Sequence, residues 1–246
     1  MIKAVIFDMG GVIAKTCWDS DYMAEVVEQI IRKYYNNVPE NFKEVFKNDM
    51  LESWLEVRES LIEVSFEDVI RKTVNKLGLA VDDFVIKEAF QKLEEGEFCH
   101  VDENVETVLK TLKEMGIKLG LISNAPGEFP INVLKREGLD KYMDVMMTSY
   151  QIGVIKPHPK IFIEALKRLG VKPEETIFVG DVPEIDVKGA KMVGMIAVLM
   201  KDCDPVMREL GMGKITDNVK PDYIINSLED VIEIVKKLNK NYSETK

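Results

Sequence analysis

The sequence predicts an α/β protein with a doubly wound parallel sheet and an inserted all-helical domain. Two observations indicate this class. Short apolar segments rich in β-branched residues alternate with helical segments over residues 101–246, which is typical of βαβ units and a parallel sheet. Residues 19–95, by contrast, show helical spacing and no convincing strand. We therefore expect a sheet that is interrupted, after its first strand, by a bundle of helices.

The first element is a strand at residues 2–7, which is almost entirely apolar, as expected for a strand buried on both faces. Gly10 and Gly11 end it. Apolar residues then recur at helical spacing over 22–34, 42–58, 65–77 and 82–95. Ser65 is the expected N-cap of the third helix, with Asp68 at the capping-box position. These boundaries predict a core of residues 1–14 and 101–246 and a helical cap of residues 15–100.

After the insertion, helices and strands alternate to the C-terminal end. We predict helices at 103–115, 128–137, 159–169, 184–193 and 227–238, and strands at 117–122, 144–147, 176–179, 195–199 and 223–225. Residues 201–222 are expected to be irregular apart from a short helix near 205–210.

The composition narrows the class of protein. Acidic residues outnumber basic ones by 43 to 33, giving a net charge of −10, which argues against binding to nucleic acid or to anionic membranes. No signal segment or spanning apolar run is present, so we expect a cytoplasmic protein. We expect it to be a monomer or a homodimer. Cys17, Cys99 and Cys203 are widely spaced, and we expect separate buried thiols rather than a disulfide framework.

Four short motifs carry the candidate chemistry. Three of them directly follow apolar runs, and parallel sheets place their ligand crevice at the carboxyl ends of such strands. We therefore expect these motifs to converge in space, bringing together carboxylates, a hydroxyl and a lysine. The motifs are Asp8-Met9-Gly10-Gly11-Val12, Ser123-Asn124, Lys156-Pro157 and Gly180-Asp181 with Asp186.

This set of side chains fits phosphoryl transfer. A carboxylate such as Asp8 can attack phosphorus and divide hydrolysis into two easier steps. Mg²⁺, held by carboxylate oxygens, would bridge the carboxylate and the phosphate, which otherwise repel each other. Lys156 would keep Asp8 ionised. We assign phosphate contacts to Ser123, Asn124, Lys156, Gly10 and Gly11.

Each motif alone has an ordinary structural explanation. Asp8 before two glycines is typical of an Asx turn, and Ser123-Asn124 is typical of a turn or an N-cap. Lys156 is compatible with a solvated loop, and Asp186 with an acidic residue in a first helical turn. Their joint occurrence, in order and at strand ends, favours one shared site.

At this point the sequence resembles the haloacid dehalogenase superfamily, in its phosphatase branch with a helical cap after the first strand. The resemblance covers the whole core and includes Val154-Ile155-Lys156-Pro157-His158-Pro159, Val179-Gly180-Asp181, Gly189-Ala190 and Gly194-Met195. It implies that Asp8 is a nucleophile that forms an aspartyl-phosphate and that Ser123 binds the phosphoryl oxygens. It also implies that Lys156 neutralises charge, and that Asp8, the carbonyl of Gly10, Asp181 and Asp186 hold Mg²⁺.

The sequence departs from that family at Gly10. The phosphatases of the family usually carry a second aspartate there, which protonates the leaving oxygen and then activates water. Loss of such a group typically costs about 10²–10⁴ in rate. Asp19 or Asp21 could replace it, and a substrate with a good leaving group would need it less.

The sequence therefore predicts a Mg²⁺-dependent phosphomonoesterase acting on a small phosphorylated metabolite. The alternative from another class is a phosphate-binding or regulatory protein whose turnover was lost with the acid at position 10. A phosphomutase needs that acid. A dehalogenase needs no metal, so the pair of acidic residues Asp181 and Asp186 argues against that activity. A phosphonate hydrolase needs a Schiff-base lysine near the site, and the sequence does not place one.

Overall fold

The computed structural model describes residues 1–201, 207 and 219–244 of the chain. At its centre is the predicted parallel sheet, whose six strands lie in the order β3-β2-β1-β4-β5-β6. Cys203 and the helix expected near residues 205–210 lie outside the described residues. The strands are β1 (Ala4–Phe7), β2 (Lys118–Ser123), β3 (Val145–Thr148), β4 (Thr176–Gly180), β5 (Ile196–Met200) and β6 (Tyr223–Ile225).

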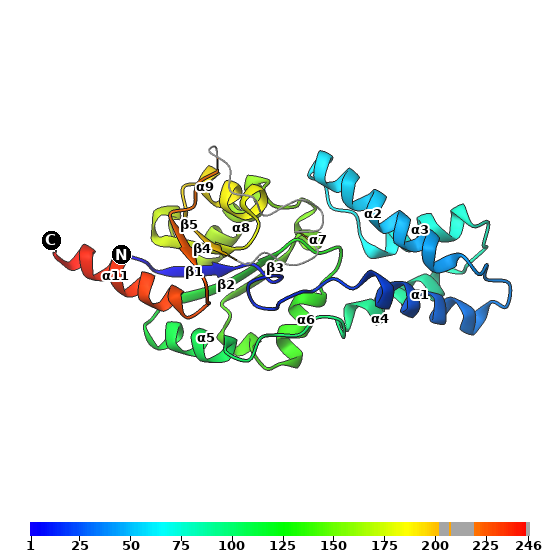
Figure 1. Cartoon of the computed structure of the whole chain (residues 1–246), viewed down its shortest axis with the longest axis horizontal. Coiled ribbons are helices and arrows are strands. Elements are labelled where there is room, and N and C mark those ends of the chain that lie inside the picture. The colour runs from blue at the N-terminus through cyan, green and yellow to red at the C-terminus, as the bar shows by residue number, and fades with distance from the viewer. Residues whose placement is uncertain (202–206, 208–218, 245–246) are drawn as a thin grey trace.

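Helices cover both faces of the sheet (Figure 1). One face packs against α5 (Val105–Glu114), α6 (Phe129–Arg136) and α11 (Asp230–Glu244), and the other against α8 (Pro159–Leu169) and α9 (Lys188–Met192). Successive side chains of a strand point to opposite faces, so Val5 and Phe7 join the first core while Ala4 and Ile6 join the second. Burial on both sides is why this strand is apolar throughout.

The predicted helical insertion is confirmed. Its helices are α1 (Ser20–Tyr34), α2 (Phe42–Ser60), α3 (Phe66–Lys76) and α4 (Asp83–Glu94). They pack against one another beyond the carboxyl ends of the strands (Figure 1). We call them the helical lobe and the remainder the sheet lobe. Ser65 and Asp68 form the predicted capping box, in which the Ser65 Oγ accepts from the Asp68 N–H at 3.1 Å.

One helix differs from its prediction. The segment expected as a single helix at 184–193 begins as a π-helical turn, Pro183–Val187, and continues as α9. The Asp186 side chain turns back to accept bonds from the N–H groups of Asp181 and Val182, which accounts for the irregular turn. Short 3₁₀ helices at Asp140–Tyr142 and Pro173–Glu175 and the one-turn helix α7 (Ser149–Ile152) complete the sheet lobe.

The two chain segments that join the lobes are fastened to each other. Ala14 and Val101 form an antiparallel bridge, and a disulfide links Cys17 to Cys99. The expectation that these two cysteines are separate thiols is therefore wrong in this structure. They are 82 residues apart in sequence and become neighbours only because the helical lobe returns the chain to the point where it left the sheet.

A further contact joins the lobes through residues 61–66, between α2 and α3. The Glu63 N–H donates to the Gly153 carbonyl at 3.2 Å, and the Phe66 N–H donates to the Pro126 carbonyl at 3.0 Å. These backbone bonds hold the start of α3 against the loops that follow β2 and α7. Over residues 1–201, 207 and 219–244, the structure has no helix that combines the length and the hydropathy needed to cross a bilayer.

Candidate active site

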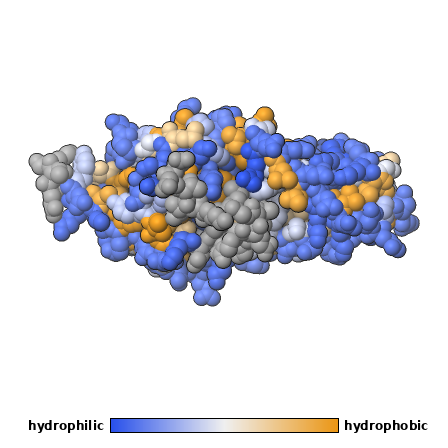
Figure 2. Space-filling view, turned by 45° about the horizontal axis from the view of Figure 1, so that its top comes forward, coloured by the Kyte–Doolittle hydropathy of each residue, from blue (hydrophilic) through white to orange (hydrophobic). Residues whose placement is uncertain are grey.

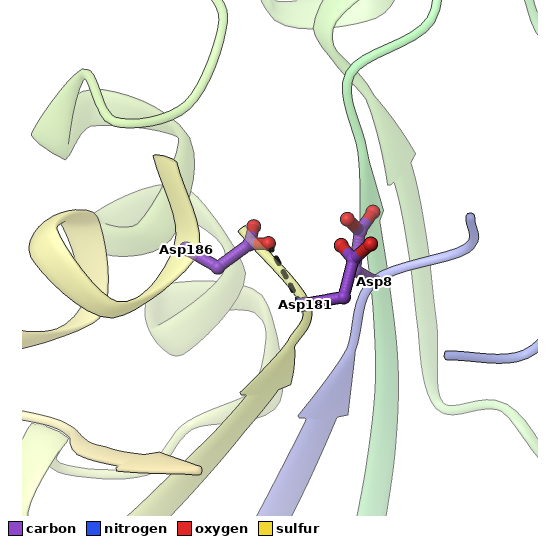
Figure 3. Close-up of side chains that lie close together, drawn as sticks. All are labelled: Asp8, Asp181 and Asp186. Carbon is purple, nitrogen blue, oxygen red and sulfur yellow. Dashed lines mark hydrogen bonds between the residues drawn. The ribbon is translucent and has the colours of Figure 1, made fainter. Parts of the chain in front are cut away.

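Three aspartates meet at the carboxyl edge of the sheet, where the strand order reverses beside β1 (Figure 3). Asp8 follows β1 and Asp181 follows its neighbour β4, while Asp186 approaches from the π-helical turn. One carboxylate oxygen from each lies within 4.8 Å of the other two. The predicted convergence of the first and fourth motifs is thus present in the structure.

Asp8 is held in place by its own backbone and by a lysine. Its N–H donates to the Val179 carbonyl at 2.9 Å, and its Oδ1 accepts from the Met9 N–H at 2.7 Å. The Lys156 Nζ lies 2.8 Å from the same Oδ1. Burial raises the pKa of Asp8 to about 6, which Lys156 opposes and the charge of Asp186 reinforces. Without a nearby positive charge, the pKa of Asp8 would therefore be raised further.

Lys156 provides one such charge from a buried position. Its side chain is 1% exposed, and its Nζ lies 2.8 Å from both Asp8 Oδ1 and Asp186 Oδ1. Burial alone would lower the pKa of Lys156, but the two carboxylates outweigh it and the pKa is raised. The solvated-loop explanation of Lys156 is therefore wrong.

Asn124 positions the backbone of Lys156. Its amide Nδ2 donates to the Lys156 carbonyl at 3.1 Å, and its Oδ1 accepts from the Lys156 N–H at 2.7 Å. The side chain is thus committed to Lys156, so any phosphate contact by Asn124 would come from its backbone N–H. Ser123, the last residue of β2, is buried on the same edge, since Leu121 pairs with Phe7. Its contact with phosphate stays a prediction.

Both oxygens of Asp186 already have partners, hydrogen-bond donors at Oδ2 and an ion pair at Oδ1. Oδ2 accepts from the N–H groups of Asp181 and Val182 at 3.1 and 3.0 Å, and Oδ1 faces the Lys156 ammonium. Direct metal coordination by Asp186 would compete with these contacts and stays a prediction. The geometry equally suits Asp186 as the residue that fixes Lys156 and the loop carrying Asp181.

Gly11 is required by its neighbours. It has a φ of +69°, and a Cβ at this position would overlap the Asp181 carboxylate. Its N–H donates to the Ala14 carbonyl at 2.7 Å, so the predicted phosphate contact by Gly11 would have to replace that bond. Gly10, whose φ is not positive, pairs with Ala14 in an isolated bridge. The roles predicted for Gly10 in metal and phosphate binding rest on the sequence alone.

Neither aspartate proposed to replace the acid at position 10 joins this cluster. Asp19 caps α1 by accepting from the Tyr22 N–H at 2.9 Å. Asp21 is exposed and pairs with Lys47 at 2.7 Å. The carboxyl missed by sequence reasoning is Glu63, which burial gives a raised pKa and which accepts a hydrogen bond from the Ser149 hydroxyl. Nothing in the local sequence marks Glu63, because its burial depends on the contact between the lobes.

A cavity of about 380 Å³ lies between the lobes, and Ile155 and Ile185, the residues before Lys156 and Asp186, line it. Asn124 forms part of its wall, together with Glu63. Trp18 and Arg58 also line it. Figure 2 shows hydrophobic side chains gathered at the junction of the two lobes.

The charges of the cluster fit a divalent cation. Three carboxylates and one ammonium leave two negative charges in a largely buried space. The three aspartates offer oxygen atoms as ligands, and a hard cation such as Mg²⁺ prefers oxygen. With such an ion bound, the cluster would be neutral and able to accept a dianionic phosphoryl group.

Comparison with known proteins identifies relatives over nearly the full chain. The family model described as haloacid dehalogenase-like hydrolase matches residues 2–194. The glyceraldehyde 3-phosphate phosphatase of Methanopyrus kandleri is 29% identical, over 98% of this chain and all of that protein. The putative pyrophosphatase PpaX of Clostridium perfringens is 27% identical, over 97% of this chain and all of that protein. A crystal structure of a HAD phosphatase from Thermococcus onnurineus, 28% identical, superposes with a TM-score of 0.66 over 95% of this chain and 98% of that one.

Proposed function

The chain belongs to the haloacid dehalogenase-like hydrolase family, and we propose that it is a Mg²⁺-dependent phosphomonoesterase of small phosphorylated metabolites. The observation that carries this proposal is the contact of Lys156 with Asp8 beside Asp181 and Asp186, at the carboxyl edge of the sheet. The relatives named as phosphatases support it. We assign the catalytic core to residues 1–14 and 101–246 and the cap to residues 15–100.

In the first step the Asp8 carboxylate attacks phosphorus, and the bond from phosphorus to the leaving oxygen breaks. The product is an aspartyl-phosphate at Asp8. Mg²⁺, held by Asp8, Asp181 and the Gly10 carbonyl, would supply positive charge to the phosphoryl oxygens. Lys156 stabilises the same developing charge from a fixed position, which requires no reorganisation during the reaction. The Ser123 hydroxyl donates a hydrogen bond to a phosphoryl oxygen.

In the second step a water molecule attacks the aspartyl-phosphate, which releases inorganic phosphate and restores Asp8. Glycine at position 10 leaves the leaving oxygen without a side-chain acid at that point, so its proton comes from solvent or from another group. Substrates with good leaving groups should therefore react fastest.

A second candidate function is phosphate binding without efficient turnover. Gly10 favours it, because the residue that usually transfers the proton is missing. The buried contact between Asp8 and Lys156 disfavours it, since a binding protein needs no nucleophile beside its cation.

Replacement of Asp8 distinguishes the two. We expect Asp8→Asn to lower phosphatase activity at least about 10³-fold, because the amide is a poor nucleophile and a weak metal ligand. Release of phosphate from a panel of phosphorylated metabolites, with and without Mg²⁺, measures this, and circular dichroism checks the fold. Wild-type protein that releases no phosphate but binds it would establish the second function. A well-folded variant with substantial activity would exclude the aspartyl-phosphate.

A further inference from the structure

The cavity between the lobes is shaped for more than the small polar groups that some relatives' names indicate. Glyceraldehyde 3-phosphate would release glyceraldehyde, a three-carbon hydroxyaldehyde, and pyrophosphate would release a second phosphate. Both leaving groups are small and polar. The cavity has about 380 Å³, within the range of pockets that enclose drug-sized ligands. Its walls thus leave space that such leaving groups would not fill.

The walls are also largely apolar and aromatic. Trp18 lies against Phe66, with ring centroids 6.1 Å apart, and both line the cavity. Trp54 enters from α2, with the Arg58 guanidinium 4.6 Å above its ring, and both residues also line the cavity. Aromatic side chains contribute most binding free energy to an apolar or aromatic ligand, because such a ligand buries apolar area against them and packs against their rings.

The cavity does not include the reacting groups themselves, but Ile155 and Ile185, which directly precede Lys156 and Asp186 in the chain, line it. Asn124 forms part of the wall and, through its two bonds to the Lys156 backbone, is fixed to the residue that contacts Asp8. A phosphoryl group held at Asp8 and Lys156 would therefore carry its leaving group toward the aromatic wall. Two cationic side chains line the cavity: Lys47, which pairs with the exposed Asp21, and Arg58, whose guanidinium lies over the Trp54 ring.

From this geometry we infer that the substrate is a phosphomonoester whose leaving group is an apolar, ring-bearing body. The inference rests on the proposed phosphatase function and names the substrate class of that site. The aromatic side chains supply affinity for the leaving group, while the aspartates and Lys156 act on the phosphate.

The decisive comparison is between 2-phenylethyl phosphate and ethyl phosphate, whose alcohols have similar acidity, so that only the body differs. We expect kcat/KM for 2-phenylethyl phosphate to exceed that for ethyl phosphate and for glyceraldehyde 3-phosphate by about 10- to 100-fold, the effect of burying a phenyl group. Trp54→Ala should lower this ratio about tenfold, and Trp54→Phe should restore most of it. Leu55→Ala is the matched control: Leu55 neighbours Trp54 on α2 but is 48% exposed and does not line the cavity, so the ratio should not change.

The outcomes separate this inference from the function beneath it. Activity that is equal or higher on ethyl phosphate, glyceraldehyde 3-phosphate or pyrophosphate overturns the ring-bearing substrate and leaves the phosphatase intact. A preference for the ring that survives Trp54→Ala overturns the cavity as its origin. Absence of turnover on every phosphate ester overturns the proposed function itself.

Discussion

At Gly11 the absence of a side chain leaves room for the Asp181 carboxylate. A Cβ there would overlap the Asp181 carboxylate, and the φ of +69° disfavours any L side chain. Gly78 provides a comparison, because its φ of +66° is similar but nothing lies within 4 Å of its would-be Cβ. Substitutions at Gly11 and Gly78 therefore distinguish two effects, the loss of stability from a left-handed backbone and the displacement of the Asp181 carboxylate.

We expect Gly11→Ala to lose at least about 100-fold in kcat/KM, by analogy with the cost of displacing a catalytic group. Gly78→Ala should keep its activity. Both variants should lose about 1–2 kcal/mol of unfolding free energy from the left-handed conformation. Urea denaturation and phosphatase assays on the two variants measure these effects. If both variants keep full activity, the position of Asp181 does not matter to turnover.

Gly10 poses a different question, because unlike Gly11 it does not have a positive φ. We expect Gly10→Asp to raise activity on alkyl phosphates by about tenfold or more, and on aryl phosphates much less, since poor leaving groups most need a proton. The ratio of the two rates measures this in a variant whose fold is verified by circular dichroism. A folded variant that is slower on both esters would show that Gly10 is not a missing acid.

At the scale of the elements, Glu94 joins the end of α4 to the start of α6. Its two carboxylate oxygens accept from the Glu128 N–H at 2.7 and 2.9 Å. Burial raises the pKa of Glu94 from 4.5 to about 7, the charge of Glu128 adds to this, and the backbone bonds oppose it. The folded protein therefore binds a proton here more tightly than the unfolded chain does.

The sign of the resulting pH dependence follows from proton linkage. Between pH 4.5 and about 7 the folded state holds more proton at Glu94 than the unfolded state, so the free energy of unfolding falls as the pH rises. We expect Glu94→Gln to remove this decrease, so that the variant gains stability relative to wild type from pH 5 to pH 8. Urea denaturation at several pH values measures it, with Glu103→Gln, at an exposed position, as the control. An unchanged wild-type slope in Glu94→Gln would contradict the assignment.

Most elements could be predicted because their patterns are local. The strand at β1 is apolar on both faces, and the helix over residues 159–169 has the predicted limits. The segment after β4 could not be predicted, because its π-helical turn depends on Asp186 reaching back to the N–H groups of Asp181 and Val182. That bond is a consequence of the site, not of helical periodicity.

At the scale of the whole molecule, the ends of the strands expected from the sequence predicted where Asp8 and Asp181 would meet. Asp8 and Asp181 meet because β1 and β4, the parallel strands that they follow, end on one edge, while Asp186 reaches them from the π-helical turn and Lys156 from the loop after α7. The contacts between the lobes could not be predicted in the same way. The disulfide of Cys17 and the burial of Glu63 arise only when the helical lobe folds back onto the sheet lobe. The amide clamp of Asn124 on Lys156 is also tertiary, since 32 residues separate the two.

The same convergence predicts how the whole protein responds to metal. The unbalanced negative charge of the three aspartates raises the free energy of the folded state, and a bound cation would relieve it. We expect chelation with EDTA to abolish phosphatase activity and Mg²⁺ to restore it. Ca²⁺ should restore little, because it prefers more ligands at longer distances. Mg²⁺ at about 100 times its dissociation constant should also stabilise the fold by about 2.7 kcal/mol.

The stability measurement gives a readout that does not depend on turnover. Thermal unfolding of wild type should move to higher temperature with Mg²⁺, and that shift should shrink in Asp181→Asn, which removes a charge at the cluster. Glu103→Gln, an exposed position outside the cluster, should keep the full shift. Activity that persists in EDTA, together with a melting temperature indifferent to Mg²⁺, would show that the cluster holds no metal. Lys156 would then be the main cation facing the phosphate, and the reaction at Asp8 would proceed without a metal.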